Sequence, residues 1–367
     1  MSIIHVTDCF LPRLGGIEVQ VAGLADAQRR AGERVHVVTA TRHAEQPPGY
    51  AVHQVAMRLP WNLPVHPRAA GHLDRILGES RPEVVYAHVG AVSPFAWSGI
   101  RSALKLGLPT VAVVHSMWDP SVQRVYRWLD RLDGWTRRPL VWGAVSTAAA
   151  DRMRTALPGV EVAVVPNGIT PVLWRRGIPE QRPDDAVHVV SVGRLAPRKQ
   201  PMHLLAVLRE AQERVGNLRA TIVGAGPEMP AMRRYLRRHG MGWVTLAGRL
   251  DREAIGRLLS GADVFVNPTV AEAFGLATLE ARTAGVPVIA RPGTGVADFV
   301  RHGVEGLLSD DLVDALARLA VDREERQRIA RHNRDTEPPC TWPRVLAALR
   351  ACRERAVRPV EAAGRRC

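Results

Sequence analysis

Short runs of apolar residues alternate with amphipathic stretches along the whole chain. In the first half, these runs are rich in β-branched residues and end in turn residues, which is typical of buried strands. The runs are Ile3–Thr7, Val35–Thr39, Ala51–Val55, Val84–Ala87, Thr110–His115, Val141–Val145 and Val162–Val165. Helical periodicity fills several of the intervals between them, including Val19–Ala31 and Arg101–Leu106. Strands that alternate with helices predict parallel sheets of the doubly wound α/β class.

A second series of strands and helices follows a polar, Pro-rich stretch, Arg175–Asp185, which we interpret as a linker. Its strand-like runs are Val187–Val192, Ala220–Val223, Val244–Leu246, Val264–Asn267, Val286–Ala290 and Gly306–Leu308. We therefore expect one Rossmann-like domain over residues 1–172 and another over residues 173–335. A helix and tail, residues 336–367, would follow and cross back to the first domain. Two such sheets side by side would form a cleft at their carboxyl ends, where ligands of this fold class bind.

The segment from Ala271 to Ala290 is the most informative part of the sequence. Glu272 and Glu280 bracket a Phe274-Gly275-Leu276 turn that opens a helix directly behind a strand. The first N–H groups of such a helix, together with its dipole, form an anion site. Carboxylates beside that site are poor phosphate ligands but good acceptors for sugar hydroxyls. A site that takes a diphosphate and several hydroxyls indicates a nucleotide-sugar ligand.

Composition and charge argue against several other classes of protein. The net charge of +14 comes almost wholly from arginines spread over both halves, since Lys105 and Lys199 are the only lysines among 50 basic residues. This spread argues against a nucleic-acid surface and leaves weak attraction to anionic lipid open. No apolar run approaches the roughly 18 residues of a membrane span. The start of the sequence does not resemble a secretory signal, and the four cysteines show no paired or metal-ligand spacing. We expect a cytoplasmic protein.

Nucleotide motifs of other classes are absent from the sequence. No Gly-x-Gly-x-x-Gly follows a strand, and there is no Gly-Lys-Ser, Gly-Lys-Thr or Asp-x-Asp. We therefore expect no metal and no cofactor, so that protein cations must neutralise a departing diphosphate. Arg194 and Lys199, in the loop after the strand Val187–Val192, are the candidates. Arg194 offers a planar fork for phosphate oxygens and Lys199 a compact charge.

Several further motifs occur at regular places in this pattern. In chain order they are Gly15-Gly16-Ile17-Glu18, His115, Val145-Ser146, Pro166-Asn167-Gly168-Ile169, Gly193-Arg194 with Lys199, Gly224-Ala225-Gly226-Pro227, Gly248-Arg249, Glu272 with Glu280, and Thr341-Trp342. With these motifs the chain resembles the retaining glycosyltransferases of the large GT4-like group, which have the GT-B fold. The resemblance covers essentially the whole chain, and the Glu272–Glu280 segment is its specific part.

The resemblance implies a role for each matching residue. Glu280 would hold the ribose hydroxyls of the donor, and Glu272 a hydroxyl of the transferred sugar, helped by the amides of three residues: Phe274, Gly275 and Leu276. Gly15 and Gly16 would let the backbone approach the diphosphate, and Gly226 would shape the nucleotide pocket. His115 would meet the donor sugar. Catalysis would then rest on His115, Arg194, Lys199 and Glu272, and the bound phosphate would accept the acceptor proton during attack on the same face of the sugar.

The acceptor side is less defined. Glu18 is a candidate for it, although a carboxylate in the first turn of a helix also complements the helix dipole. Trp61 lies in a Pro-rich aromatic loop, and His88 ends a strand. A predicted amphipathic helix over Val122–Leu132, with several tryptophans around it, is either packed on the sheet or in contact with an anionic membrane.

These observations favour transfer of a hexosyl-type sugar from a UDP- or GDP-sugar to a hydroxyl group of the acceptor. The acceptor would be lipid-linked or a glycan. Peripheral binding of the protein to the inner membrane face is left open. The alternatives are a sugar-nucleotide epimerase, a phosphorylase and a non-catalytic binding protein. The base, the sugar, the acceptor and the oligomeric state do not follow from the sequence.

Overall fold

The computed structural model describes residues 2–13, 15–47, 49–57, 66–175 and 185–364. Two compact units make up the chain. Unit 1 consists of Met1–Gly168 with Trp342–Cys367, and unit 2 consists of Ile169–Thr341. The boundaries expected from the sequence, after residues 172 and 335, lie a few residues away from these. Trp61 and most of the expected linker lie outside the described residues.

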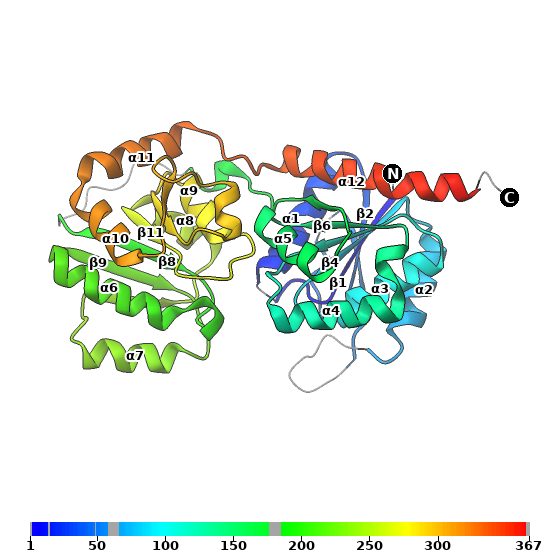
Figure 1. Ribbon diagram of the computed structural model, residues 1–367, viewed down its shortest axis with the longest axis horizontal. Coiled ribbons are helices and arrows are strands. Elements are labelled where there is room, and N and C mark those ends of the chain that lie inside the picture. The colour runs from blue at the N-terminus through cyan, green and yellow to red at the C-terminus, as the bar shows by residue number, and fades with distance from the viewer. Residues whose placement is uncertain (1, 14, 48, 58–65, 176–184, 365–367) are drawn as a thin grey trace. The chain divides into compact units, whose positions relative to one another are not determined.

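Unit 1 is built on a parallel sheet of seven strands in the order β3-β2-β1-β4-β5-β6-β7 (Figure 1). The strands are β1 Ser2–Thr7, β2 Arg34–Thr39, β3 Ala51–Gln54, β4 Val84–Val89, β5 Thr110–Val114, β6 Leu140–Ala144 and β7 Val162–Val164. The helices are α1 Gly16–Arg30, α2 Ala69–Ser80, α3 Pro94–Lys105, α4 Pro120–Asp133, α5 Thr147–Ala156 and α12 Trp342–Gly364. Every strand expected from the sequence in this half is present.

Alternate residues of β4 show how the sheet of unit 1 is covered. Ala87 and Val89 belong to a core cluster with residues of α3, α4 and α5. Tyr86 points to the other face, where its hydroxyl donates to the carbonyl of Leu349 on α12 over 3.3 Å. Helix α12 also packs on α1, β5 and β6. The terminal helix that begins at Trp342 is therefore an integral part of unit 1.

Unit 2 contains a parallel sheet of six strands in the order β10-β9-β8-β11-β12-β13. The strands are β8 Val187–Val192, β9 Leu218–Val223, β10 Val244–Gly248, β11 Val264–Val266, β12 Val288–Ala290 and β13 Gly306–Leu308. The helices are α6 Pro201–Val215, α7 Met229–Arg238, α8 Arg252–Ser260, α9 Leu276–Thr283, α10 Leu312–Val321 and α11 Arg323–Asp335. One core cluster joins α6, α7 and α10 to the sheet.

One helix start differs from the expectation. The sequence suggests that Gly224 and Gly226 open a helix at Pro227, but α7 begins at Met229. The backbone at Leu195 intervenes, because its N–H donates to the carbonyl of Ala225 and its carbonyl accepts from the N–H of Glu228, both over 3.0 Å. A Cβ at Gly226 would lie 2.1 Å from the carbonyl oxygen of Leu195. This close approach of two loops, rather than a helix start, requires the glycine.

Candidate functional site

The strand order of unit 2 reverses at β8, with β9 on one side and β11 on the other. Loops that leave such a reversal point at the carboxyl ends of the strands diverge and leave room for a ligand. The loop after β8 carries Lys199, and the loop after β11 carries Glu272. Lys199 Nζ lies 2.6 Å from Glu272 Oε2. The structure thus brings two of the predicted catalytic residues into one charge-assisted hydrogen bond.

Asn267 and Thr278 hold the other side of Glu272. Asn267 directly follows β11, and its Nδ2 lies 3.4 Å from Glu272 Oε2 and 3.1 Å from Thr278 Oγ1. Thr278 is fully buried in α9. The side chain of Asn267 therefore ties the loop carboxylate to the helix behind it. The sequence analysis did not single out Asn267, although a polar residue at the carboxyl end of an apolar strand is a signal for this kind of position.

The first turn of α9 presents unpaired backbone donors. Gly275, the N-cap, has a φ of +87°, and a Cβ there would lie 2.7 Å from Val296 Cγ2. The amides of Phe274, Gly275 and Leu276 donate no hydrogen bond to any part of the chain that the structure describes. The Phe274 ring is buried against Phe299, with centroids 5.2 Å apart. This segment thus offers a ligand its backbone N–H groups and not the Phe274 side chain.

Glu280 is the second carboxylate of the segment and lies in the middle of α9. It forms no side-chain hydrogen bond or ion pair with the described residues. Although the residue keeps some exposed surface, burial raises the pKa of its carboxyl group to about 8, against the opposing charge of Arg252. The guanidinium of Arg252 lies over the Trp174 ring, 5.2 Å from its centroid. A partly buried carboxyl group with open hydrogen-bonding capacity is suited to bind hydroxyl groups.

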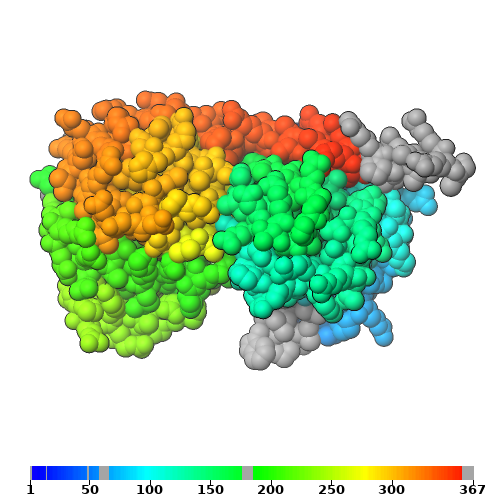
Figure 2. Space-filling model, in the orientation of Figure 1, coloured from blue at the N-terminus to red at the C-terminus, as the bar shows by residue number. Residues whose placement is uncertain are grey.

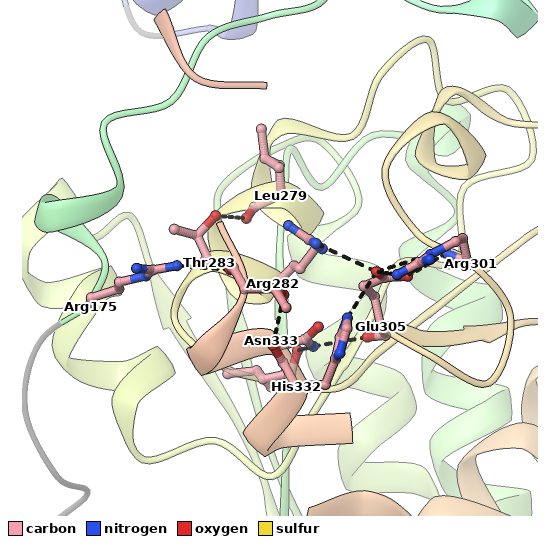
Figure 3. A network of polar contacts seen from close by, with 10 residues as sticks. Arg175, Leu279, Arg282, Thr283, Arg301, Glu305, His332 and Asn333 are labelled. Atoms are coloured by element: carbon pink, nitrogen blue, oxygen red, sulfur yellow. Dashed lines mark hydrogen bonds and ion pairs between the residues drawn. The ribbon is translucent and has the colours of Figure 1, made fainter. Parts of the chain in front are cut away.

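The C-terminal half of α9 is fixed by a polar network (Figure 3). Arg282, which is 3% exposed, lies 3.6 Å from Glu305 Oε1. Glu305 also accepts from Arg301 and His332, and Asn333 bonds the carbonyls of Glu305 and Val286. Burial opposes ionisation of Glu305, but the hydrogen bonds from Arg301 and His332 and the charge of Arg282 lower its pKa to about 2. The network anchors α9 and is separate from the predicted site residues.

The remaining predicted donor residues of unit 2 are placed as follows. Arg194 is exposed in the loop after β8, and its side chain forms no hydrogen bond or ion pair with the described residues. Gly226 lies in the loop after β9, where backbone packing on Leu195 accounts for the glycine. Its predicted contact with a donor therefore rests on the resemblance alone.

Unit 1 contains the glycine motif at the start of α1. Gly15 is the N-cap, Gly16 is the first residue, and Glu18 lies in the first turn and is buried. A Cβ at Gly15 would lie 2.3 Å from Glu18 Oε2, so the carboxylate folds back over the cap. Arg13 Nε approaches Glu18 Oε1 to 3.6 Å. This geometry matches the capping role that the sequence left open for Glu18.

His115 and His88 lie in a chain of hydrogen-bonded histidines. His88 Nδ1 lies 2.9 Å from His115 Nε2, and His88 Nε2 lies 3.0 Å from His5 Nδ1. His88 is 2% exposed, so its side chain has neither surface nor a free nitrogen for an acceptor. Direct contact with an acceptor, as the sequence suggested for His88, does not fit this placement. His115 follows β5 and keeps part of its surface.

Helix α4 departs from its predicted packing. The sequence suggests one apolar stripe of Val122, Val125, Leu129 and Leu132, but the structure divides these residues. Val122, Tyr126 and Leu129 pack in the core with three tryptophans, Trp118, Trp135 and Trp142. Val125, Trp128 and Leu132 are 38%, 57% and 62% exposed. The helix therefore has a buried face and a second apolar face at the surface of unit 1. Figure 2 shows this part of the chain, in blue-green, at the surface of unit 1.

The described residues contain no group of three or more His, Cys, Asp or Glu side chains that could hold a metal ion. No helix among them is long and apolar enough to cross a membrane. In the part of unit 2 that the structure describes, Arg194, Lys199 and the N-terminus of α9 can bind a diphosphate, while Glu272 and Glu280 can bind hydroxyls.

Two family models match the chain in succession. Residues 14–173 match Glycosyltransferase Family 4, and residues 178–336 match Glycosyl transferases group 1. A GDP-mannose-dependent alpha-mannosyltransferase of Mycolicibacterium smegmatis is 30% identical, over 95% of this chain and 96% of its own. A GDP-mannose-dependent alpha-(1-6)-phosphatidylinositol monomannoside mannosyltransferase of Mycobacterium tuberculosis is 28% identical, over 88% of this chain and 90% of its own.

Solved structures share this fold. The structure of Anabaena Alr3699/HepE in complex with UDP and glucose aligns with a TM-score of 0.72, over 91% of this chain and 93% of that one, at 19% identity. This likeness concerns the fold, which is GT-B. The matching models and the relatives confirm the family expected from the sequence. The chain belongs to the GT4-type group 1 glycosyltransferases and is a glycosyltransferase that uses a nucleotide-sugar donor.

Proposed function

We propose that this protein transfers a mannosyl residue from GDP-mannose to a hydroxyl group of a membrane lipid, with retention of anomeric configuration and without a metal ion. The Lys199–Glu272 ion pair beside the free amides of α9 is the observation that carries the donor site. The choice of GDP-mannose is supported by the M. smegmatis relative, whose name states this donor and which matches nearly the whole chain.

The donor would bind along α9. Glu280 would accept the ribose hydroxyls, since its carboxyl group has no partner among the described residues. Glu272 would accept a sugar hydroxyl through the oxygen positions that its bonds to Lys199 and Asn267 leave open. The amides of residues 274–276 would donate to the sugar and diphosphate oxygens.

Lys199 and Arg194 would neutralise the negative charge on the departing diphosphate. The ammonium of Lys199 has three N–H donors and uses one on Glu272, so two remain for phosphate oxygens. Arg194 is exposed and can approach from the neighbouring part of the same loop. Two cations at this position are the basis for proposing metal-independent transfer.

Retention would follow from attack on the face that the diphosphate leaves. The bond from the anomeric carbon to the phosphate oxygen breaks, the acceptor oxygen bonds to the same face, and the leaving phosphate takes the acceptor proton. This mechanism needs no protein nucleophile. His115 would contact the donor sugar, and Gly15 and Gly16 would allow the backbone of unit 1 to approach the diphosphate, as the family resemblance implies.

A lipid acceptor is supported by α4. Val125, Trp128 and Leu132 form its exposed apolar row, and Arg124, Arg127 and Arg131 are exposed beside them. Apolar residues flanked by arginines fit the interface of an anionic membrane. The name of the M. tuberculosis relative states a phosphatidylinositol-based acceptor, which agrees with such a surface. Peripheral binding at the cytoplasmic face of a membrane is thus part of the proposal.

The test is a transfer assay with purified protein, GDP-mannose labelled in the sugar, and EDTA. Vesicles that contain phosphatidylinositol or its monomannoside supply the acceptor, and the same headgroups without acyl chains are the comparison. The proposal predicts labelled lipid and an equal amount of GDP. Conversion of the nucleotide-sugar or phosphorolysis without acceptor would instead indicate an epimerase or a phosphorylase, and binding without turnover a non-catalytic protein. Activity only with UDP-sugars would overturn the assigned donor.

A further inference from the structure

Helix α7 has four arginines on one face and no acidic residue. The arginines are Arg233, Arg234, Arg237 and Arg238, and all of them are exposed. Since each residue turns a helix by about 100°, these side chains lie within an arc of roughly 140°. The rest of the helix packs on the core of unit 2 through Met229, Met232, Tyr235 and Leu236. The arginine face is therefore turned to solvent, and Figure 1 shows α7 beside α6 at the edge of unit 2.

The positive charge of this face is not balanced within the part of the chain that the structure describes. No side chain of the four arginines forms an ion pair or a hydrogen bond with a described residue. Helices α6 and α10 pack in the same core cluster as α7, and each of their arginines has an acidic partner. The pairs are Arg209 with Glu213, Arg214 with Glu210, and Arg318 with Glu325. A general excess of arginine in the composition therefore does not explain the unpaired arginines of α7.

The arrangement is unfavourable for the helix by itself. Like charges four residues apart destabilise a helix, and two such pairs occur here, Arg233 with Arg237 and Arg234 with Arg238. The helix dipole favours basic residues in the last turn, which accounts for Arg237 and Arg238 but not for the other two. A negatively charged partner would relieve the repulsion. The face thus fits an anionic surface by charge complementarity.

Helix α7 begins beside the loop of the proposed donor site. The N–H of Glu228, which is the N-cap residue, donates to the carbonyl of Leu195 over 3.0 Å. Leu195 lies in the loop after β8, between Arg194 and Lys199. The arginine face is therefore on a helix that is anchored at the donor-binding edge of unit 2.

We propose that the arginine face of α7 docks unit 2 on an anionic lipid membrane, through ion pairs between the guanidinium groups and lipid phosphates. The choice of a membrane as the partner rests on the proposed lipid acceptor. The large apolar side chains of α7 pack on the core, so the helix binds to the headgroups and does not enter the acyl region. Contact through α7 is thus electrostatic, whereas α4 of unit 1 also presents apolar side chains. Each unit then has its own membrane contact.

The experiment measures partitioning of the whole chain into vesicles of phosphatidylcholine, with and without phosphatidylglycerol, at low and high salt. The test variant combines Arg233→Gln, Arg234→Gln, Arg237→Gln and Arg238→Gln. The matched control removes the same charge from unit 2 at arginines that have acidic partners, by Arg209→Gln, Arg214→Gln, Arg257→Gln and Arg318→Gln. An arginine near an anionic surface strengthens binding about fivefold. At low salt we therefore expect partitioning into anionic vesicles to fall at least about tenfold in the test variant and less than about threefold in the control.

High salt should remove the difference between the two variants, since it screens the attraction of exposed charges. Equal losses in the two variants, or unchanged partitioning of the test variant, would overturn the proposal. Loss of binding to duplex DNA with unchanged binding to vesicles would also overturn it and would assign the face to nucleic acid. If the test variant does not fold, the double variant Arg234→Gln with Arg238→Gln repeats the test on the same face.

The docking surface and the proposed function can fail separately, because partitioning needs neither nucleotide nor acceptor. If the test variant loses partitioning but the wild type transfers no mannose, the proposed function fails and the surface on α7 stands. If the wild type transfers mannose to lipid and the test variant partitions as the wild type does, the function stands and the surface on α7 is wrong.

Discussion

The ammonium of Lys199 lies 2.6 Å from a carboxylate oxygen of Glu272, although 73 residues separate them in the sequence. The contact links the loop after β8 to the loop after β11, at the reversal point of the sheet of unit 2. Lys199 is 31% exposed at its side chain and Glu272 13%. The pair is therefore partly open to solvent at the carboxyl ends of β8 and β11, and both side chains keep hydrogen-bonding capacity for a ligand.

Replacing Lys199 should affect catalysis far more than folding. We expect Lys199→Met to lower kcat by a factor of about 10² to 10³, because one preorganised cation is lost from the charge that develops on the diphosphate. Its effect on the free energy of unfolding should stay below about 1 kcal/mol, since a partly exposed ion pair contributes little. Steady-state kinetics and urea unfolding measure the two quantities.

Lys105→Met is the matched control for this variant. Lys105 is the only other lysine of the sequence and pairs with Asp74 over 2.7 Å in unit 1, with its side chain 70% exposed. The control should leave kcat unchanged. Equal losses in the two variants would contradict a specific role of Lys199.

Donor binding should depend on pH through Glu280. The pKa of about 8 means that the free protein holds this proton at pH 7, whereas binding of hydroxyl groups favours the carboxylate. The affinity for GDP should therefore rise by up to about tenfold per pH unit from pH 6 towards pH 8 and level off above it. Calorimetry at several pH values, in buffers of different ionisation enthalpy, measures both the affinity and the proton released.

Glu280→Gln serves as the comparison for this prediction. It should bind GDP more weakly, with no proton release and no rise in affinity towards pH 8. Without ligand, the pH dependence of its unfolding free energy should also differ from that of the wild type. A carboxyl group with a raised pKa in the folded state stabilises the fold below its unfolded pKa of 4.5 and loses that contribution as the pH rises through about 8. The glutamine variant should lack this decline, and an identical pH profile in both proteins would refute the assignment.

The network behind α9 should respond unequally to removal of its two buried partners. Glu305→Gln leaves Arg282 buried without a counter-charge, and we expect it to cost about 3–5 kcal/mol in unfolding free energy. Arg282→Met should cost much less, because Nε and Nη1 of Arg282 have no hydrogen-bond partner and Glu305 keeps Arg301 and His332. Denaturant unfolding of both variants measures the difference.

The same network has a defined pH dependence. The lowered pKa of Glu305 gives a stabilisation that is complete above the unfolded pKa of 4.5 and is lost as the pH falls towards 2. Wild-type stability should decline over that range, and Glu305→Gln should show a smaller decline. Similar losses in Glu305→Gln and Arg282→Met at neutral pH would contradict the account of this pair.

Membrane binding should depend on the exposed row of α4. The double variant Trp128→Ser with Leu132→Ser should lower partitioning into anionic vesicles at least about tenfold, because two large apolar side chains no longer enter the interface. Sedimentation with vesicles at low and high salt measures the apolar and electrostatic contributions separately. Val321→Ser is the control, since Val321 is 74% exposed on α10 of unit 2. Unchanged partitioning of the double variant would remove the membrane from the proposal.

The strands were predictable because strands buried on both faces read as continuous apolar runs, and all of the expected strands are present. The strand, turn and helix of the donor segment, residues 264–283, were also predictable, because they are contiguous in the sequence. Contacts between distant segments were not. The sequence suggested Lys199 and Glu272 separately, but their pairing depends on the placement of β11 beside β8.

The hydrogen-bonded histidines and helix α4 are two further cases in which contacts between distant segments could not be predicted from the sequence. His5, His88 and His115 meet because of the order β1-β4-β5 and the register of these strands, which a single sequence does not reveal. In α4, the sequence placed Val122, Val125, Leu129 and Leu132 on one apolar stripe, although they lie on two neighbouring faces of the helix. The sheet covers only the side that carries Tyr126, so Val125 and Leu132 remain at the surface.

The most direct test of the donor site is a thermal shift with GDP and with UDP, each in EDTA, for the wild type and for Glu280→Gln. A nucleotide at about 100 times its dissociation constant adds roughly 2.7 kcal/mol to the stability of the folded protein. The account predicts clear stabilisation of the wild type by GDP, less by UDP, and a strongly reduced response in Glu280→Gln. Equal stabilisation of both proteins, or no response to either nucleotide, would contradict a donor site on α9.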